Sequence, residues 1–437
     1  MTESIHRQPY FQVNARGTSF ARVGLFPLGA TIASCPHPND PARTRWVQLM
    51  NLFEGSDRGV GVLCRISDDK GHTWRETGVF DRAYRFNAEP AEKLLKLQNG
   101  CIYDERSGAI IRFVTEYVWK EGSAETILDS ILRKRRIYYC LSFDSGETWT
   151  DACYIYQEGG GYDRDTMFPG VTFGQNMIMP AMPIIVRGAG MHKGDIAVGV
   201  QIQMVDEAGT LINPTIMGFF KSACLFGNWN ADEGRYMWTM SANCVEVSVG
   251  ESTRGLYEPS LCECDDGRLI MLLRGSNTKA REHMPGTKWI SVSDDQGVTW
   301  SKPFRLCYDD GSLMYSSSSL SCLVRDTAGT FYYVGIVNGD NPDGNLPRYP
   351  LCAARLHTDT LTIERASVTT IVTKQAQHDE AAGVHPVDYS NHSALWDDEE
   401  DKLVMFVPLR PDLRKFEGEL LCVELTAKPH KRQVGHG

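Results

Sequence analysis

Three patterns in the sequence predict an all-β protein built as a six-bladed β-propeller. An octapeptide of the form S-x-D-x-G-x-T-W occurs three times, and a longer strand–turn–strand pattern recurs with an average step of about 73 residues. Period-2 and continuous apolar runs dominate, whereas stretches with helical periodicity are scarce. Six repeats of this length account for all 437 residues, so we expect one closed ring of six similar units.

Each octapeptide has the composition of a tight turn between two strands. The three copies span residues 67–74, 142–149 and 293–300. The Asp can accept backbone N–H bonds across the turn, the Gly can supply a positive φ, and the Trp can pack against the turn. We therefore expect these aspartates to stabilise hairpins and to take no part in catalysis.

The longer repeat predicts the domain organisation. Its clearest copies are EPSLCECDDGRLIMLLRG, from Glu258, and YSNHSALWDDEEDKLVMFVPL, from Tyr389. With the weaker copies, the expected blades begin near residues 22, 93, 168, 258, 315 and 389. We expect residues 1–437 to form one propeller domain, in which residues 428–437 are a flexible tail.

The charge balance restricts the ligands that the surface can attract. Lys and Arg number 45 against 55 Asp and Glu, which leaves a net charge of −10 at pH 7. Such a surface repels nucleic acid and anionic membranes, so neither is expected as a partner. The basic run RKRR at residues 133–136 leads directly into an apolar strand pattern and is expected at a solvated edge. An anionic ligand would need its own focused cluster of arginines.

The chain start and the cysteines bear on the compartment. The N-terminal residues contain no apolar stretch long enough for a secretion signal, and no segment is apolar enough to span a membrane. The thirteen cysteines are scattered singly and lie mostly inside apolar runs, which is typical of buried free thiols in a reducing compartment. These observations predict a cytoplasmic location.

The three octapeptides match the Asp-box, and with the blade pattern they make the chain resemble the sialidase (neuraminidase) superfamily of Asp-box, or BNR-repeat, propellers over nearly its whole length. The resemblance implies a site at the propeller mouth. There, three arginines hold the substrate carboxylate, a glutamate activates a tyrosine nucleophile, and an aspartate acts as acid and base. Guanidinium groups bind carboxylates through paired hydrogen bonds, and a tyrosine with an ordinary pKa of about 10 needs a carboxylate nearby to react. The resemblance implies no metal and no cofactor.

Two segments carry the resemblance most clearly. YEPSLCECDDGRLIMLLRG resembles the family's glutamate strand followed by its second arginine, which assigns Glu258 and Arg274. The DDG turn between them would return Arg274 toward a neighbouring edge of the mouth. DYSNHSALWDDEEDKLVMF resembles the tyrosine-bearing strand of the last blade and assigns Tyr389 as the nucleophile. Tyr315 begins the preceding blade in a similar way.

The resemblance also implies positions for the other three groups. Arg22, in FARVGLFP, lies where the family has its first arginine, although the aromatic-Arg-Ile-Pro signature is interrupted here. Arg348, in NPDGNLPRYPLCAARL, corresponds to the third arginine, with Arg355 as the alternative. Asp57 precedes the first octapeptide by ten residues and corresponds to the acid/base, with Glu54 as its rival.

Three histidines recur every seven residues close to the predicted nucleophile. They are His378, His385 and His392, but Gly383 and Pro386 break any helix that would align them on a metal. We therefore expect no metal site. A histidine near the mouth can serve as a base in a propeller lyase, so His392 keeps that alternative open.

The resemblance implies a retaining exo-glycosidase that removes a terminal acidic sugar, in the first place an exo-α-sialidase. Tyr389, Glu258 and Asp57 would be its catalytic residues, while Arg22, Arg274 and Arg348 would bind the substrate. One alternative is a propeller lyase or glycosidase that acts on another acidic sugar, such as a uronate. Another is a non-catalytic or recruited sialidase-like propeller. In each enzymatic case the expected partner is a small acidic sugar or glycoconjugate.

Overall fold

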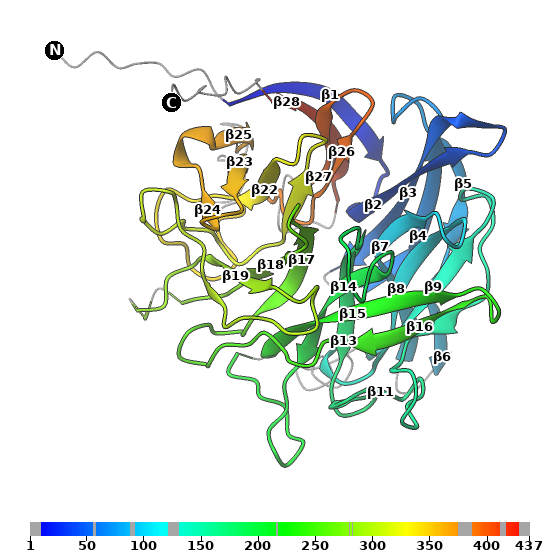
Figure 1. The fold of residues 1–437 in the computed structure, drawn as a ribbon, viewed down its shortest axis with the longest axis horizontal. Helices are drawn as coiled ribbons and strands as arrows, with labels where there is room; N and C mark the ends of the chain where they lie inside the picture. Colours follow the sequence, from blue (N-terminus) through cyan, green and yellow to red (C-terminus); the bar gives the residue numbers. More distant parts are fainter. Residues whose placement is uncertain are drawn as a thin grey trace.

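The protein is an all-β six-bladed β-propeller, as the sequence predicts. A computed structural model describes residues 10–55, 58–87, 92–120, 131–215, 217–278, 280–281, 283–374, 387–410 and 417–427. Six antiparallel sheets follow one another in chain order around the molecule (Figure 1).

The first three blades occupy the N-terminal half of the chain. Blade one contains β2 (Phe26–His37), β3 (Asp40–Gly55), β4 (Arg58–Ser67) and β5 (Arg75–Phe80). Blade two contains β6 (Tyr84–Asn87), β7 (Glu92–Asp104), β8 (Ala109–Lys120), β9 (Arg135–Ser142) and β10 (Cys153–Tyr154). A small hairpin of β11 (Thr166–Phe168) and β12 (Val171–Thr172) precedes blade three. Blade three contains β13 (Ile178–Ile185), β14 (Ile196–Gln203), β15 (Phe220–Asn230) and β16 (Arg235–Met240).

The other three blades complete the ring. Blade four contains β17 (Tyr257–Glu263), β18 (Leu269–Arg274), β19 (Lys288–Ser293) and β20 (Phe304–Arg305). Blade five contains β21 (Ser321–Arg325), β22 (Phe331–Ile336), β23 (Leu351–His357), β24 (Thr362–Ile363) and β25 (Thr369–Val372), with the 3-10 helix η1 (Arg365–Ser367). Blade six contains β26 (Ser393–Asp397), β27 (Lys402–Leu409), β28 (Glu419–Ala427) and, from the start of the chain, β1 (Phe11–Ala21).

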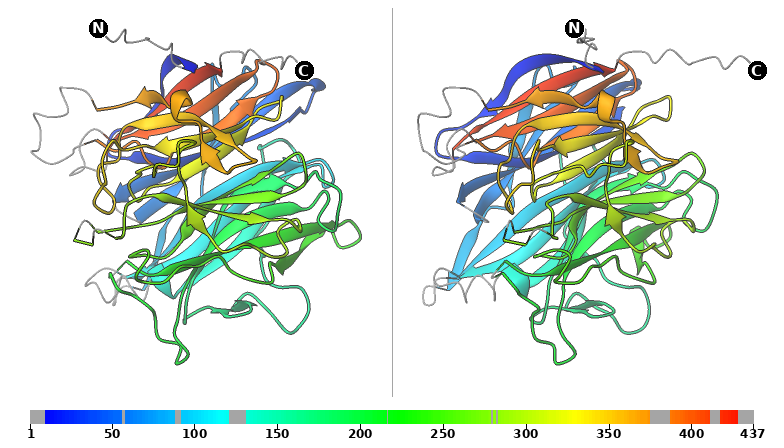
Figure 2. Two further views of the ribbon diagram at one scale, coloured as in Figure 1. Left: turned by 60° about the vertical axis from the view of Figure 1, so that its left-hand side comes forward. Right: turned by 90° about the vertical axis from the view of Figure 1, so that its left-hand side faces the viewer.

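Strands from both ends of the chain close the ring in blade six. The antiparallel ladder between β1 and β28 makes β1 the outermost strand of that blade. Figure 2 shows β1, in blue, lying beside β28, in red. The segment that follows β1 must then cross from the outer edge of blade six to the inner strand of blade one.

The innermost strand of each blade lies next to that of the following blade, in the order β2, β7, β13, β17, β21, β26 and back to β2. These strands begin within four residues of the predicted starts in blades one, two, four and six. Blade three differs most, because the predicted start at residue 168 belongs to the β11–β12 hairpin and the inner strand begins only at Ile178. Side chains from the starts of these six strands can therefore meet on one axis.

The octapeptide turns join β4 to β5 in blade one, β9 to β10 in blade two and β19 to β20 in blade four. In the third copy, the Asp295 carboxylate accepts the backbone N–H of Thr299 at 2.8 Å and the Thr299 hydroxyl at 2.6 Å. The Ser293 hydroxyl accepts the backbone N–H of Gly297, whose φ is +89°. The same bonds recur around Asp69 and Asp144. Each aspartate is thus occupied within its own turn, as the composition predicts.

Replacing Asp295 with alanine is expected to lower the free energy of unfolding by about 2 kcal/mol, because three hydrogen bonds to a charged acceptor are lost. The adjacent Asp294 is exposed and accepts none of these bonds. Asp294→Ala is therefore the matched control and should change the free energy of unfolding by less than about 0.5 kcal/mol. Urea denaturation of both variants measures the difference, and equal losses would show that the turn bonds do not stabilise the fold.

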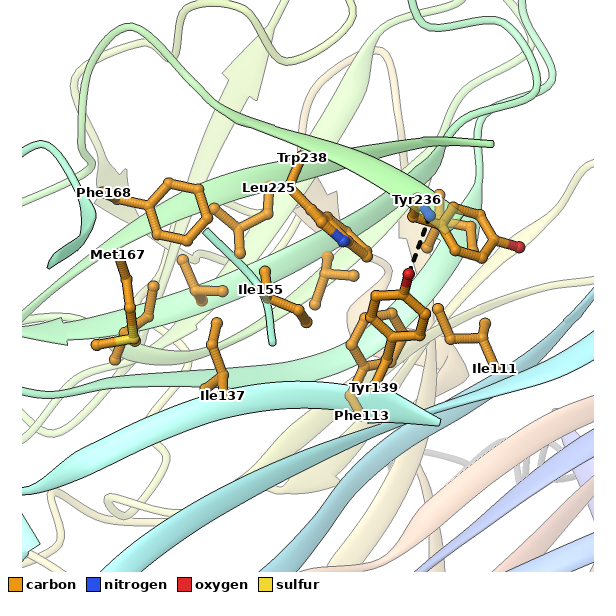
Figure 3. Close-up of a cluster of buried hydrophobic side chains, with 14 of the residues drawn as sticks. Ile111, Phe113, Ile137, Tyr139, Ile155, Met167, Phe168, Leu225, Tyr236 and Trp238 are labelled. Atoms are coloured by element: carbon orange, nitrogen blue, oxygen red, sulfur yellow. Dashed lines mark hydrogen bonds between the residues drawn. The ribbon is translucent and has the colours of Figure 1, made fainter. Parts of the chain in front are cut away.

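Apolar side chains fill the spaces between neighbouring blades. Figure 3 shows the cluster between blades two and three, where Phe113 and Tyr139 face Tyr236 and Trp238. The backbone N–H of Tyr236 donates to the Tyr139 hydroxyl at 3.0 Å, so this aromatic contact also satisfies polar groups. All thirteen cysteines are free, and most of them are buried. In the described ranges, no helix combines the length and the apolar character that a membrane crossing requires.

Candidate active site

A cavity of about 420 Å³ lies at the centre of the ring and is lined by residues of all six blades. Its two halves differ in character. Blades one to three contribute mainly apolar side chains, among them Phe26, Phe53, Met179, Met217 and Phe220. Blades four to six contribute most of the charged groups, namely Arg254, Glu258, Arg274, Arg348, Asp388 and Arg410.

Glu258 begins the inner part of blade four in an unusual backbone conformation. Its φ is +48°, in the left-handed region that non-glycine residues rarely adopt, and the β17–β18 ladder shifts register between Tyr257 and Ser260. The Glu258 N–H donates to the side-chain oxygen of Gln201 on β14, at 3.1 Å. Because of this irregularity, the consecutive residues Tyr257 and Glu258 both line the cavity. Strained residues of this kind cluster at functional sites.

The Glu258 carboxylate is paired with Arg274, which ends β18. Nη1 of Arg274 donates to both carboxylate oxygens, at 2.7 and 2.8 Å. Burial raises the pKa of Glu258, but the charges of Arg274, Arg254 and Arg348, together with the Arg274 hydrogen bonds, outweigh burial and lower this pKa below its ordinary value. Glu258 is therefore an ionised carboxylate at neutral pH, surrounded by three arginines.

Most of the hydrogen-bonding capacity of Arg274 is used within the protein. Its Nε donates to the Ser318 hydroxyl at 3.0 Å, and its Nη2 donates to Oδ1 of Asn345 at 3.1 Å. Its guanidinium carbon also lies 4.6 Å from the centre of the Tyr257 ring. Arg274 is thus a fixed partner of Glu258, with few N–H groups left for a ligand.

Arg348 retains a nitrogen that can bind a ligand. Its Nη1 donates to Asp388 at 2.9 Å and to the Ser390 hydroxyl at 2.7 Å, and its Nε donates to the Asn345 carbonyl at 3.3 Å. Nη2 has no hydrogen-bond partner in the described part of the chain, and the residue lines the cavity. Asn345 connects the two arginines, because its side chain binds Arg274 and its backbone binds Arg348.

Arg254 is the third arginine beside Glu258, and the sequence patterns did not identify it. Its guanidinium carbon lies 4.7 Å from the centre of the Tyr257 ring, and its Nη2 donates to the Met217 carbonyl at 3.0 Å. In the sequence, Arg254 is marked only by its position in STRGLYEP, four residues before Glu258. The loop that precedes β17 brings Arg254 to the cavity.

Arg22 was expected among the substrate-binding arginines, but the structure does not bring it to the cavity. It follows β1, the outermost strand of blade six, and its Nη2 pairs with Glu76 on β5, the outermost strand of blade one, at 3.1 Å. This location results from the ring closure, in which the start of the chain supplies an outer strand rather than an inner one. Arg22 thus occupies the outer side of the blade junction.

Tyr389 was expected as the nucleophile, but its side chain faces away from the cavity. Its hydroxyl donates to the Thr373 carbonyl at 3.1 Å, and its ring packs in the apolar cluster between blades five and six. The preceding residue, Asp388, lines the cavity instead and binds Arg348. Consecutive residues of an extended segment point to opposite sides, so Asp388 faces the cavity while Tyr389 faces the apolar cluster.

The remaining predicted residues are the acid/base candidates Asp57 and Glu54 and the alternatives Arg355 and Tyr315. Asp57 lies outside the described residues, although its neighbours Gly55 and Arg58 pair at the end of the β3–β4 hairpin. Its rival Glu54 is exposed. The alternatives Arg355 and Tyr315 do not line the cavity, and Arg355 pairs with Glu364 at 3.5 Å.

His392 lines the cavity as a buried, neutral imidazole. Its Nε2 donates to the Val334 carbonyl at 3.2 Å, and burial lowers the pKa of His392 to about 4. His378 and His385 lie outside the described residues. Where the structure is described, no group of three His, Cys, Asp or Glu side chains is placed to hold a metal ion.

Comparisons with known proteins agree with this architecture. The BNR repeat-like domain model matches residues 53–368. A Dyadobacter fermentans protein of unknown function superposes with a TM-score of 0.57 at 12% identity, covering 95% of this chain and 99% of its own. The NanB sialidase of Streptococcus pneumoniae, as its K499G mutant, superposes with a TM-score of 0.57 at 11% identity, covering 96% and 71%. The Hadza microbial sialidase Hz136 superposes with a TM-score of 0.54 at 12% identity, covering 92% and 66%.

A comparison with curated proteins finds no significant match. At these low identities the structural likenesses establish the fold, whereas the family model covers well over half of the sequence. The chain therefore belongs to the BNR repeat-like domain family, and its propeller has the sialidase-like fold.

Proposed function

We propose that this protein is a glycosidase that releases a sugar bearing an anionic group, with Glu258 as its catalytic carboxylate. The observation that carries the proposal is the cluster of Arg254, Arg274 and Arg348 around Glu258 in the central cavity. The protein as a whole carries a net charge of −10. Such a cluster attracts a small anion that the rest of the surface repels. The sialidase-like fold supports glycoside chemistry, and the cluster supports an acidic substrate.

The described groups suit distinct steps of glycoside cleavage. An ionised Glu258, held by Arg274, can stabilise or attack the positively charged sugar carbon that develops as the glycosidic bond breaks. Arg348, through the Nη2 that makes no hydrogen bond to the described residues, can hold the anionic group of the sugar. A proton donor for the leaving oxygen is also required, and Asp57 remains our candidate on the basis of the family resemblance.

Two placements favour an acidic sugar other than sialic acid. Tyr389 and Arg22, which a sialidase-type mechanism would use as nucleophile and first arginine, do not line the cavity. Tyr257 does line it, but this residue is only 1% exposed and its hydroxyl is bonded to the Ser318 hydroxyl. A carboxylate mechanism through Glu258 therefore fits this cavity better than a tyrosine mechanism, and a uronate is the second candidate to be tested beside a sialoside.

The apolar half of the cavity adds a second substrate feature. Met179, Met182 and Met217, with Phe26 and Phe53, line this part of the cavity. Flexible methionine side chains adapt to apolar groups of varied shape. A glycoside that combines an acidic sugar with an apolar aglycone matches both halves.

Fluorogenic glycosides in matched pairs test the proposal directly. A glucuronide and a glucoside of 4-methylumbelliferone, with the same anomeric configuration, differ only at C6, which is a carboxylate in the first and a hydroxymethyl group in the second. The sialoside of the same fluorophore tests the sialidase alternative. We expect kcat/KM for an acidic glycoside to exceed that for its neutral counterpart at least about 100-fold, since a charge-assisted guanidinium contact is lost with the carboxylate. Equal turnover of both members would refute acidic specificity, and no turnover of any glycoside would favour a binding propeller.

Arg348→Met is expected to raise KM for the acidic substrate about 10- to 100-fold and to leave the neutral one unchanged. Arg22→Met removes the same kind of side chain outside the cavity and should leave both values unchanged. If Arg22→Met raised KM for the acidic substrate as much as Arg348→Met, Arg22 would belong to the substrate-binding arginines, as in the sialidase-type set.

A further inference from the structure

A fully buried lysine lies on the strand next to Arg274. Lys288 begins β19, stands opposite Arg274 in the β18–β19 ladder, and has an exposed fraction of 0%. Its Nζ donates to the carbonyls of Ser317, at 3.0 Å, and Ser319, and to the Ser319 hydroxyl at 3.3 Å. Burying a lysine amine is costly unless its N–H groups are hydrogen-bonded, and these three contacts provide the acceptors.

The acceptors of Lys288 belong to a run of four buried serines, residues 316–319. Within this run, the Ser318 hydroxyl accepts Nε of Arg274 at 3.0 Å and bonds the Tyr257 hydroxyl at 2.8 Å. The backbone N–H of Ser318 donates to the Gly344 carbonyl at 2.8 Å, next to Asn345. The serine run therefore connects the lysine to the arginine that holds Glu258.

We propose that Lys288 and Ser318 are positioning residues, which fix the guanidinium of Arg274 and through it the carboxylate of Glu258. The lysine gathers the carbonyls on either side of Ser318, and this sets the direction in which the Ser318 hydroxyl points. Ser318 then holds the Nε edge of Arg274, so that Nη1 faces both oxygens of Glu258. The inference rests on the proposed function in one respect, that Glu258 is the catalytic carboxylate.

The electrostatics agree with this geometry. Burial and the positive charges of Arg274 and Arg348 lower the pKa of Lys288 well below its ordinary value, while Glu258 opposes them. The charges of these cavity groups therefore act on Lys288. If Arg274 were free to rotate away, Glu258 would remain buried with less compensation, and its pKa would rise.

Ser318→Ala tests the proposal, with Ser316→Ala as its matched control. Ser316 is equally buried, but its hydroxyl donates to the Ile336 carbonyl at 2.6 Å and to the Ser317 carbonyl at 3.4 Å, and neither of these residues lines the cavity. The ionisation of Glu258 is followed through the δ-carbon chemical shift of ¹³C-labelled glutamate, assigned by comparison with Glu258→Gln. We expect the pKa of Glu258 to rise by about one unit in Ser318→Ala and to remain unchanged in Ser316→Ala.

In the kinetic arm, Ser318→Ala should lower kcat about tenfold with little change in KM, and the acid limb of the pH–rate profile should move upward. Lys288→Met should also raise the pKa of Glu258. Because this substitution is expected to reduce stability as well, the variant and the wild-type protein are compared under conditions where the same fraction of each is folded. Identical behaviour of Ser318→Ala and Ser316→Ala in both arms would overturn the proposal. If the wild-type protein cleaves no glycoside, the proposed function fails, while the chemical-shift titration still decides whether Lys288 and Ser318 position Glu258.

Discussion

Replacing Glu258 with glutamine is expected to reduce kcat for the acidic glycoside about 10³-fold, while the substrate still binds. The amide keeps the size of the side chain and can accept a hydrogen bond from Arg274, but it carries no charge to stabilise the developing cation. Steady-state kinetics give kcat, and calorimetric titration with the free acidic sugar gives the binding constant. A variant that retains more than about a tenth of the wild-type kcat would exclude Glu258 as the catalytic carboxylate.

The substitution also removes one partner of a largely buried ion pair, so stability must be measured alongside activity. We expect the free energy of unfolding to fall by about 3 kcal/mol, because the Arg274 charge loses its counterion. Glu246→Gln is the matched control, since Glu246 is exposed and does not line the cavity. It should change neither kcat nor the unfolding midpoint. Loss of activity in Glu258→Gln is interpreted only under conditions where the variant remains folded.

Acidification from pH 7 to pH 4 is expected to destabilise the protein by about 3 kcal/mol through His392 alone. The pKa of His392 is about 4 in the folded protein against an ordinary value of 6.5, so the unfolded chain takes up the proton first. The contribution of His392 is complete above pH 6.5, declines as the pH falls to about 4, and changes no further below that value. Urea denaturation at half-unit pH steps measures this slope.

His392→Gln keeps a donor for the Val334 carbonyl but cannot take up a proton in this range, so its stability should change much less between pH 6.5 and 4. His283→Gln is the control, because His283 is exposed, and it should retain the wild-type slope. Equal slopes in the wild-type protein and His392→Gln would mean that other groups cause the acid sensitivity. The pKa of His392 also bears on the lyase alternative, because a histidine that acts as the base must be unprotonated at the pH at which the enzyme works.

Much of the architecture could be predicted because it depends on short-range contacts. The octapeptide turns close through bonds between residues four apart, as Asp295 and Thr299 show, so eight letters are enough to recognise them. Glu258 and Arg274 also belong to one hairpin, in which the number of intervening residues brings the two ends together. Both of these predictions required nothing from distant parts of the chain.

The set of residues that meet in the cavity was harder to predict, because it depends on how the blades close the ring and on which side of the backbone each side chain lies. Tyr389 lies four residues before β26 and its hydroxyl bonds to the Thr373 carbonyl, whereas the preceding residue, Asp388, lines the cavity. Arg254 reaches Glu258 from a loop without a motif. The roles of Lys288 and Ser318 depend on buried hydrogen bonds, which leave no mark on a linear pattern.

The sequence by itself determined that this protein is a propeller of six blades, where the octapeptide turns lie, and that Glu258 and Arg274 share a hairpin. These features follow from repeats and from contacts within single blades. Only the tertiary structure decided which arginines surround Glu258. Arg22 lies on the outer side because β1 closes the ring as an outer strand, and Arg254 and Arg348 reach the centre because the inner strands meet around one axis. Ring closure joins residues hundreds of positions apart, and no local pattern records that geometry.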